Sequence, residues 1–238
     1  MKNTLLFFLI LFFNISVAQR KNINVQYSVQ IYDEEIMKNI DPEFRKMFES
    51  AISTAHLLSY NLVITDKGSK FCEDTFIPIS DTDKFMKSST LFSGYMGITY
   101  QYLGNLYFEK KNSGNDLMVK EPLKSNWKLY DETKMIDNYL CYKATNVNVV
   151  YNRSGKIFNH PVIAWYCPKL PYNYGPNGYS NLPGLILELQ VRNVVFGAKK
   201  IDLNSALDFD FDFLKNVKTI SRNELDKKID DEMQLLKG

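Results

Sequence analysis

The chain has 238 residues, of which 45% are hydrophobic and 24% charged, and its 29 basic and 27 acidic side chains leave a formal charge of +2. These values are ordinary for a folded globular protein, and they exclude a disordered chain, a polytopic membrane protein and a strongly basic nucleic-acid binder. Tyrosine and phenylalanine account for most of the 14% aromatic residues, a content that favours β-structure.

The N-terminus has the pattern of a secretory signal peptide. Lys2 supplies a positive charge ahead of an apolar run from Leu5 to Phe13, which is much shorter than the ~20 residues that a membrane-spanning helix needs. Small residues then occupy positions Ser16 and Ala18, and this spacing predicts cleavage after Ala18. An uncleaved N-terminal anchor is the alternative interpretation.

The remaining sequence predicts one exported domain. We assign residues 1–18 to the signal peptide and 19–238 to a single β-rich domain, because no low-complexity linker, long charge run or repeat marks a further boundary. The first cysteine is Cys72, so the new N-terminus has no cysteine for a lipid anchor. We therefore expect a periplasmic or secreted protein whose mature chain has no integral membrane span.

Short segments rich in alternating, β-branched and aromatic residues predict most of the secondary structure. In chain order the expected strands are Asn24–Tyr32, Leu57–Thr65, Ser69–Thr75, Ile98–Tyr102, Leu106–Lys110, Leu117–Lys120, Lys128–Tyr130, Tyr139–Tyr151, Ile157–Tyr166, Leu185–Val195 and Lys199–Asn204. A helix is expected from Pro42 to about Ala55, with Asp41 as its N-cap, because apolar residues there recur at helical spacing. A charged helix is expected over Glu224–Leu236.

These elements favour a mainly β (α+β) fold. We expect a single curved antiparallel sheet, or half-barrel, with one or two helices packed against it. The stretch 208–213 alternates aspartate with phenylalanine, which predicts an edge strand with a charged solvent face. A calcium site on the alternate aspartates is the other interpretation, but the sequence lacks the glycine and glutamate pattern of a known calcium loop.

A loop rich in proline, glycine and tyrosine lies between Pro161 and Pro183. It holds five of the chain's eight prolines, and since proline removes a backbone donor, this stretch cannot be the interior of a sheet. Two interpretations stay open: a recognition surface that exposes its tyrosines, or a structural plug that covers one end of the sheet. The candidate binding residues in and beside this loop are Trp165, Tyr166, Tyr172, Tyr174, Tyr179, Pro183, Gly184 and Glu188.

Two of these candidates have further alternatives. Trp165 follows Ala164 on an expected strand, so it either lines the core or stacks on a ligand. Glu188 interrupts an apolar run, and its side chain therefore points either to solvent at a strand edge or into a cavity. In a cavity the carboxyl group would have a raised pKa and could act as an acid or base.

Several spaced blocks resemble the signature of one family. The blocks are Trp127-Lys128-Leu129 with Glu132-Thr133-Lys134, Tyr139-Leu140-Cys141-Tyr142-Lys143-Ala144, Ala164-Trp165-Tyr166, Gly175-Pro176 and Asn181-Leu182-Pro183-Gly184-Leu185-Ile186-Leu187-Glu188. They stand in the order found in the GLPGLI family, also called the Porph_ging family, and span most of the mature chain. Asn181 replaces the first glycine of the signature, and asparagine tolerates the positive φ that such a turn requires.

The resemblance implies a secreted or periplasmic protein of Gram-negative bacteria related to Bacteroides and Flavobacterium. It implies no particular activity, because the family has no established reaction, and so no functional residue can be carried over to this chain. Asn138 replaces a family glycine and Cys167 replaces a frequent family threonine. A disulfide through Cys167 would therefore not be general to the family.

The cysteines and histidines set limits on the chemistry. Pairing of Tyr139–Tyr151 with Ile157–Tyr166 around a turn would bring Cys141 close to Cys167, so a cross-strand disulfide is conceivable; buried free thiols are the alternative. A hydrolase that uses Cys167 or Glu188 with His160 lacks any motif to support it. No metal site and no cofactor is expected, since the chain has two histidines and no C-x-x-C motif.

A non-enzymatic role is favoured over catalysis, because no catalytic constellation is evident. The first hypothesis is an exported binding or carrier protein whose concave sheet face holds an apolar ligand or a peptide segment. The second is an accessory protein that contacts an outer-membrane transporter or secretion system through its tyrosine- and proline-rich loop. The expected partner is accordingly an apolar ligand or an envelope protein, and not a nucleic acid.

Overall fold

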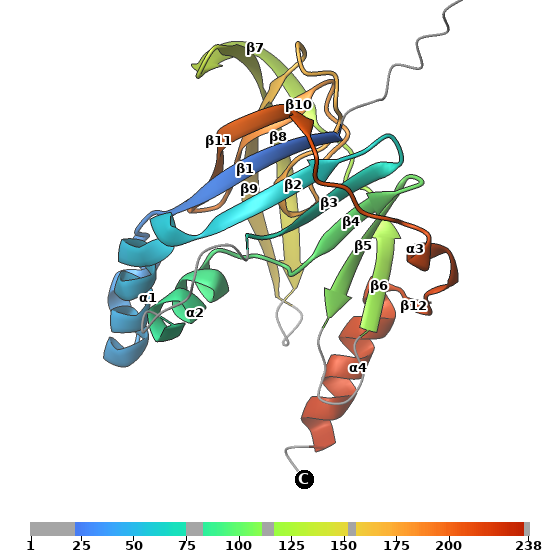
Figure 1. Ribbon diagram of the computed structural model, residues 1–238. Coiled ribbons are helices and arrows are strands. Elements are labelled where there is room, and N and C mark those ends of the chain that lie inside the picture. The colour runs from blue at the N-terminus through green and yellow to red at the C-terminus, as the bar shows by residue number, and fades with distance from the viewer. Residues whose placement is uncertain (1–21, 75–82, 111–116, 152–155, 236–238) are drawn as a thin grey trace, which may run out of the picture.

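The computed structural model describes residues 22–74, 83–110, 117–151 and 156–235, and the expected signal peptide over 1–18 lies outside these ranges (Figure 1). One twelve-stranded sheet dominates it, in the order β12-β6-β5-β4-β3-β2-β1-β11-β10-β9-β8-β7. The strands are β1 Asn22–Ile31, β2 Ser59–Ile64, β3 Gly68–Glu73, β4 Thr99–Tyr102, β5 Asn105–Lys110, β6 Leu117–Pro122, β7 Lys128–Ile136, β8 Tyr139–Tyr151, β9 Ile157–Cys167, β10 Leu185–Val191, β11 Val194–Ser205 and β12 Thr219–Ile220.

The sheet is open and almost wholly antiparallel. β1 lies near its middle and pairs with β2 on one side and β11 on the other. On these two sides stand an N-terminal wing, β2–β6, and a C-terminal wing, β7–β11. Among the strands of the described ranges, only β12 is parallel to its neighbour, β6. The expectation of a mainly β fold built on one antiparallel sheet is confirmed, and Figure 1 shows how strongly this sheet bends.

Alternating burial along β1 explains which face of the sheet holds the core. Val25, Tyr27 and Val29 are fully buried, whereas the residues between them face the other side and are polar. Successive side chains of a strand point to opposite faces, so the pattern assigns an apolar inner face and a polar outer face to the centre of the sheet.

The described residues form four helices beside the sheet, which is more than the one or two expected. They are α1 Pro42–Thr54, α2 Asp83–Phe92, α3 Phe213–Asn216 and α4 Arg222–Leu235; short 3-10 helices occupy Glu35–Asn39 (η1), Ala55–Leu57 (η2) and Pro176–Gly178 (η3). α1 begins as expected, with the Asp41 carboxylate accepting bonds from the backbone N–H groups of Glu43 and Phe44. Its buried Phe48 meets the ring of Phe92 from α2 at 5.1 Å. Among the described residues, no helix has the length and apolarity to cross a membrane.

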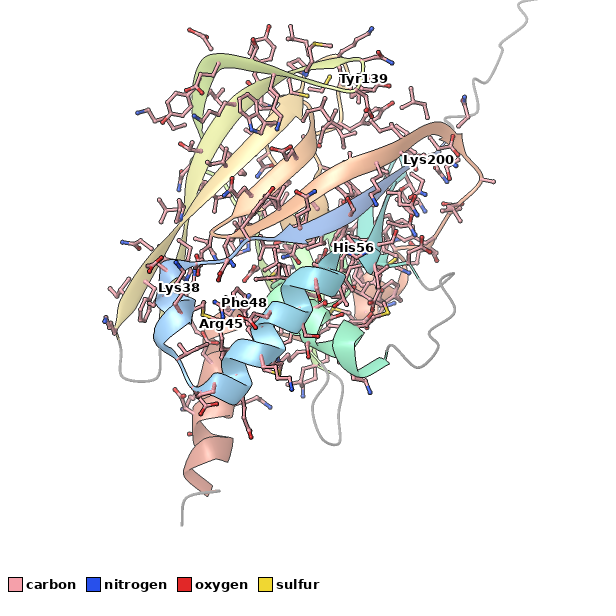
Figure 2. All side chains as sticks on the ribbon, turned by 90° about the vertical axis from the view of Figure 1, so that its left-hand side faces the viewer. Lys38, Arg45, Phe48, His56, Tyr139 and Lys200 are labelled. Atoms are coloured by element: carbon pink, nitrogen blue, oxygen red, sulfur yellow. The ribbon has the colours of Figure 1, made fainter. Side chains whose placement is uncertain are left out.

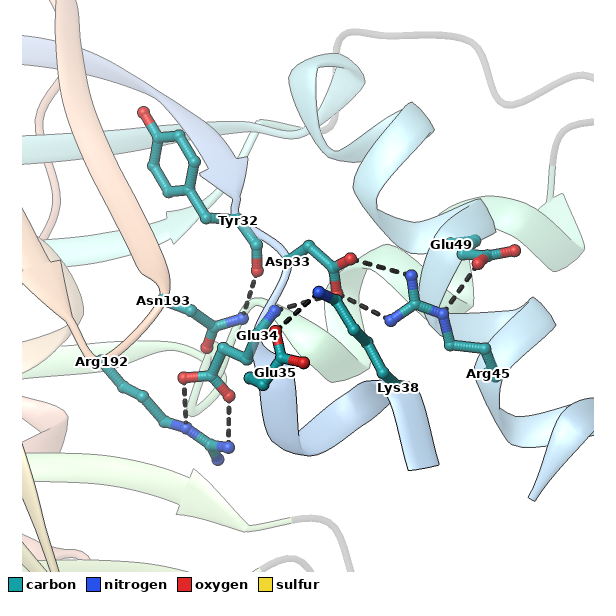
Figure 3. A network of polar contacts seen from close by, with 9 residues as sticks. All are labelled: Tyr32, Asp33, Glu34, Glu35, Lys38, Arg45, Glu49, Arg192 and Asn193. Carbon is teal, nitrogen blue, oxygen red and sulfur yellow. Dashed lines mark hydrogen bonds and ion pairs between the residues drawn. The ribbon is translucent and has the colours of Figure 1, made fainter. Parts of the chain in front are cut away.

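A network of polar contacts joins the helices to the end of β1 (Figure 3). Arg192, in the turn between β10 and β11, pairs with Glu34, while the Asn193 side-chain N–H donates to the Tyr32 carbonyl at 2.7 Å. Arg45 of α1 holds both carboxylate oxygens of Asp33, at 2.7 and 2.8 Å. That guanidinium lowers the pKa of the Asp33 carboxyl group. Exposed ion pairs add little stability, so the network mainly orients α1 against the sheet.

The turn in this network also corrects one expectation. Leu185–Val195, expected as a single strand, forms β10 and the start of β11, joined by a two-residue turn at Arg192 and Asn193. Arg192 adopts a φ of 56° there. Neither turn residue is glycine or proline, and apolar residues stand on both sides of the turn. The apolar pattern of the strand therefore continues through the turn, and the sequence gives no sign that the strand ends there.

The segment after β11 crosses the outer face of the N-terminal wing and is here called the strap (residues 206–212). The expectation of an edge strand over 208–213 was wrong, since residues 206–211 have no regular structure and α3 follows. The Phe211 ring stacks on Tyr102 at 5.0 Å and 12°. Gly68 makes room for it, because a Cβ atom there would stand 2.9 Å from the ring. The Asp–Phe alternation thus reflects packing of phenylalanines on tyrosines, not strand pairing.

Candidate functional site

The proline- and tyrosine-rich loop lies on the inner face of the sheet and is here called the plug (residues 168–184). Tyr179 is 3% exposed and Leu182 is 1% exposed, and both belong to the main apolar core. Gly178 sits so close to Leu106 of β5 that a Cβ atom would come within 2.8 Å of that side chain, and its φ of 77° also favours glycine. The plug therefore extends from the C-terminal wing onto strands of the N-terminal wing.

Hydrogen bonds hold the plug against both wings. Asn177 accepts a bond from the Met96 backbone N–H at 3.1 Å and donates to the Gly94 carbonyl at 2.9 Å. The Trp127 indole N–H donates to the Ser180 carbonyl at 2.8 Å. The buried Tyr27 hydroxyl of β1 donates to the carbonyl of Ile186, just beyond the plug, at 2.6 Å. The polar groups of this irregular backbone thus find partners inside the protein.

The signature motif forms the turn that ends the plug. Asn181 adopts a φ of 65°, the conformation that its replacement of glycine requires, and its backbone N–H donates to the Asn173 carbonyl at 3.0 Å. Gly184 has a φ of 154°, and a Cβ atom on it would stand 2.3 Å from the Cys167 carbonyl oxygen. Both ends of the plug consequently meet at one place, where Leu185 pairs with Cys167 across β10 and β9.

The candidate binding residues occupy very different environments. Tyr166, Tyr179 and Gly184 are buried, Tyr172, Tyr174, Trp165 and Glu188 are half-buried, and Pro183 is exposed. Burial raises the pKa of the Tyr166, Tyr174 and Tyr179 hydroxyl groups, which stay protonated at neutral pH. These placements agree with the plug interpretation of the loop. A role of the eight residues in ligand binding stays a prediction.

Glu188 and Trp165 meet a third residue that the sequence did not single out. Glu188 lies opposite Trp165 in the β10–β9 register, after a bulge at the buried Leu187. The Lys134 ammonium group donates to both Glu188 oxygens, at 2.8 and 2.7 Å, and lies 5.5 Å from the centre of the Trp165 ring. Glu188 therefore forms an ion pair with Lys134 at a partly exposed surface, and we interpret this pair as structural. Lys134 belongs to the Glu132-Thr133-Lys134 block. Because it is 54 residues from Glu188 in the sequence, the contact between them could not be predicted.

The groups of the hydrolase hypothesis are not brought together. His160 and Cys167 lie on the same strand, β9, seven residues apart, which corresponds to about 23 Å at ~3.3 Å per residue. A proton cannot pass directly over such a distance. In the described part of the chain, no group of three or more histidine, cysteine, aspartate and glutamate residues could hold a metal ion.

Two hollows in the described surface are polar. One of about 200 Å³ lies over the outer face, and its lining residues are Asn24, Gln26, Asn61, Asp74, Lys200, Asp202 and Leu207. A more open one of about 410 Å³ lies beside the β7–β8 turn and is lined by Asp137, Asn138, Tyr139, Lys199, Lys200 and Ile201. Figure 2 shows Tyr139 and Lys200 in this part of the molecule, at a distance from α1. Neither lining fits an apolar ligand.

The ends of β8 and β9 form an exposed apolar extension, here called the ribbon (residues 146–151 and 157–161). β7 pairs with β8 only as far as Thr145 within the described residues, so 146–151 pair with β9 alone. Val147 is 54% exposed, Val149 46% and Ile157 55%. Their side chains share one face, because Val149 lies opposite Asn159 in the ladder and Val147 opposite Pro161. The run Asn-Val-Asn-Val-Val predicts a strand, but the sequence alone does not predict the exposure of its valines.

Lys124 covers the plug from the side of β6. Its ammonium group lies 4.0 Å from the centre of the Tyr179 ring, and its carbonyl accepts a bond from the Asn181 side chain at 3.1 Å. Burial, together with the nearby positive charge of Arg222, lowers the pKa of Lys124 to about 8. The amine is therefore poised between its charged and neutral forms near neutral pH.

The plug also carries the segment by which this chain matches a known family. Residues 156–188, from β9 through the plug to β10, match the family model described as a protein of unknown function (Porph_ging). The chain carries the Porph_ging signature. The resemblance inferred from the sequence is thereby confirmed, and the Porph_ging segment coincides with the part of the chain that joins the two wings.

Comparison with a solved structure of PNGF-II at a TM-score of 0.50 shows a shared fold. Two structures of PNGF-II, in different space groups, align with 87% of this chain at 15% sequence identity, with TM-scores of 0.50 and 0.48. The alignment covers 32% of the PNGF-II chain, so this protein spans about a third of that length. At this identity the likeness concerns the fold alone. No curated protein matches the chain.

We predict that Gly184→Ala destabilises the protein. The added methyl group would press on the backbone of Cys167 and Pro168, which cannot move away without opening the root of the plug. The expected loss is about 2–4 kcal/mol of unfolding free energy in urea denaturation. Gly197→Ala is the matched control, because a Cβ atom at Gly197 meets nothing within 4 Å. Equal stability of the two variants would contradict this account of the signature glycine.

A second prediction concerns the pH dependence of stability and Lys124. Its folded pKa of about 8 lies below the ordinary 10.5, so between these values the unfolded chain binds a proton that the folded chain does not. Stability contributed by this site therefore rises with pH across that window. We expect the wild type to gain about 2 kcal/mol over Lys124→Met between about pH 7.5 and 10.5, measured by urea denaturation. A difference that stays constant with pH would refute the assignment.

Proposed function

We propose that this protein is an exported, non-enzymatic binding protein of the cell envelope, and that its ribbon recognises an extended segment of a partner polypeptide. Export to the periplasm or beyond is supported by the leader-like sequence over 1–18. The observation that carries the proposal is the open, apolar edge of β8. A partner protein in the envelope is favoured over a small apolar ligand because the plug already occupies the inner face of the sheet.

The backbone of β8 offers a template for a further strand. The Val147 backbone N–H donates to the side chain of its neighbour Asn146 at 2.8 Å, not to β9, so this residue's backbone groups face the open edge. In an antiparallel strand the N–H and C=O groups of every second residue point to the same edge, and those of Val149 therefore point to the same open edge as those of Val147. An extended peptide of about six residues would span 146–151 and form a ladder of main-chain hydrogen bonds.

The side chains of the ribbon supply apolar contacts to such a peptide. Val147, Val149 and Ile157 lie on one face and are about half exposed. A two-stranded ribbon is only marginally stable in water, and long exposed edges are usually blocked by charges or bulges. A partner strand would cover these valines and complete the sheet.

A carrier that holds an apolar ligand on the concave face has less support. That face is occupied by the plug, whose Tyr179 and Leu182 are buried against strands of both wings. A ligand in this place would have to displace them. In the plug, Tyr179 is buried and Tyr172 and Tyr174 are half-buried, so only part of their surface is open to a partner, and we place the docking surface on the more exposed ribbon.

The test selects peptides from a random displayed library on the full chain and measures their affinity by fluorescence polarisation. We expect selected peptides to alternate apolar residues and to bind Val149→Lys at least about 10-fold more weakly, a loss of roughly 1.4 kcal/mol. Leu203→Lys is the matched control, since Leu203 is an apolar β-strand residue outside the ribbon with 42% exposure. Selected peptides that bind both variants alike, or no selection at all, would contradict the proposal.

A further inference from the structure

Cys141 and Cys167 lie side by side at the base of the ribbon. Tyr142 pairs with Tyr166 in the β8–β9 register, so the next positions outward bring the two cysteines opposite each other. Both side chains are completely buried, and both are free thiols in this structure. The third cysteine, Cys72, lies on β3 in the other wing. Directly opposite residues of antiparallel strands have the Cα separation that a disulfide needs.

From this geometry we propose that Cys141 and Cys167 form a disulfide that closes the base of the ribbon, while Cys72 remains a free thiol. The bond forms by thiol–disulfide exchange: each thiol loses its proton, one sulfur–sulfur bond forms, and the two electrons reduce the disulfide of an oxidant such as oxidised glutathione or a disulfide-carrying oxidoreductase to two thiols. The inference does not depend on a binding partner. It rests on the register of β8 and β9 alone.

The position of the bond suggests what it stabilises. It would close a covalent loop that contains the whole ribbon, which restricts the unfolded chain around an element whose valine side chains are about half exposed. It would also anchor the plug, because the Cys167 carbonyl accepts a bond from the Leu170 backbone N–H at 3.1 Å and lies against Gly184. One bond would thus stabilise both the ribbon and the place where the two ends of the plug meet.

Burial determines when the bond can form. Desolvation and the neighbouring sulfur raise the pKa of the Cys141 thiol to about 12, so the folded protein holds almost no thiolate there. Thiol–disulfide exchange needs a thiolate and an access path. Oxidation therefore precedes burial during folding, and reduction of the finished bond requires unfolding. Cys72, which is only half-buried, is available to reagents in the native state.

The test refolds the full chain with reduced and oxidised glutathione, alkylates it in denaturant with iodoacetamide, and measures the intact mass. We expect one alkylated thiol, mapped to Cys72 by peptide analysis, and three after reduction in denaturant. Under native conditions dithiothreitol should leave the bond intact. Three alkylated thiols before reduction, or a bridge that includes Cys72, would overturn the proposal.

Two variants remove ambiguity from this experiment. Cys72→Ser should still form the bridge and show no alkylated thiol, which excludes mixed pairing. Cys141→Ser should leave two thiols, and the ribbon amides over 146–151 should then exchange with solvent faster than in the oxidised wild type. Unchanged exchange would show that the bond does not stabilise the ribbon. Since no peptide is present, failure of this proposal is distinguishable from failure of peptide binding.

Discussion

The packing of the plug between the two wings is the interaction on which the rest of the structure depends. A twelve-stranded open sheet with an apolar inner face needs a cover, and α1 and α2 contact only one part of it. The plug supplies the remaining cover through Tyr179 and Leu182, and the Tyr27–Ile186 hydrogen bond fastens its end to the central strand. The curvature of the sheet follows, because β4 and β10 contact the same short loop although four strands separate them in the sheet order.

This arrangement has a functional consequence, since it separates a packed body from an exposed extension. The inner face is closed by the protein's own chain, and the strap closes part of the outer face through Phe211 and Tyr102. Only beyond Thr145 do β8 and β9 leave the body. The proposed docking edge and the proposed disulfide lie at the tip and the base of the same two strands. In both proposals the packed body supports the ribbon, which is only marginally stable by itself.

The sequence predicted the local structure well and the long-range contacts poorly. The alternation along β1, the Asp41 cap and the helix from Pro42 are local signals, and each was recognised. The plug was recognised from its prolines, but its position was not, because the contact of Gln101 with Tyr179 joins residues far apart in the chain. The strap was mistaken for a strand because phenylalanines packing on Tyr100 and Tyr102 recur every second residue, as they would in a sheet. The contacts of Lys134 and Lys124 could not be predicted from the sequence, because their partners, Glu188 and Tyr179, lie in distant segments.

Amide hydrogen exchange of the plug tests the central claim most directly. The backbone N–H groups of Asn181, Leu185 and Ile186 donate to carbonyls within or beside the plug. If the plug is an integral part of the core, these amides exchange only through global unfolding, at the same free energy as the amides of β1. Exchange of these three amides within seconds, while β1 stays protected, would show a loop that opens independently and would contradict the account.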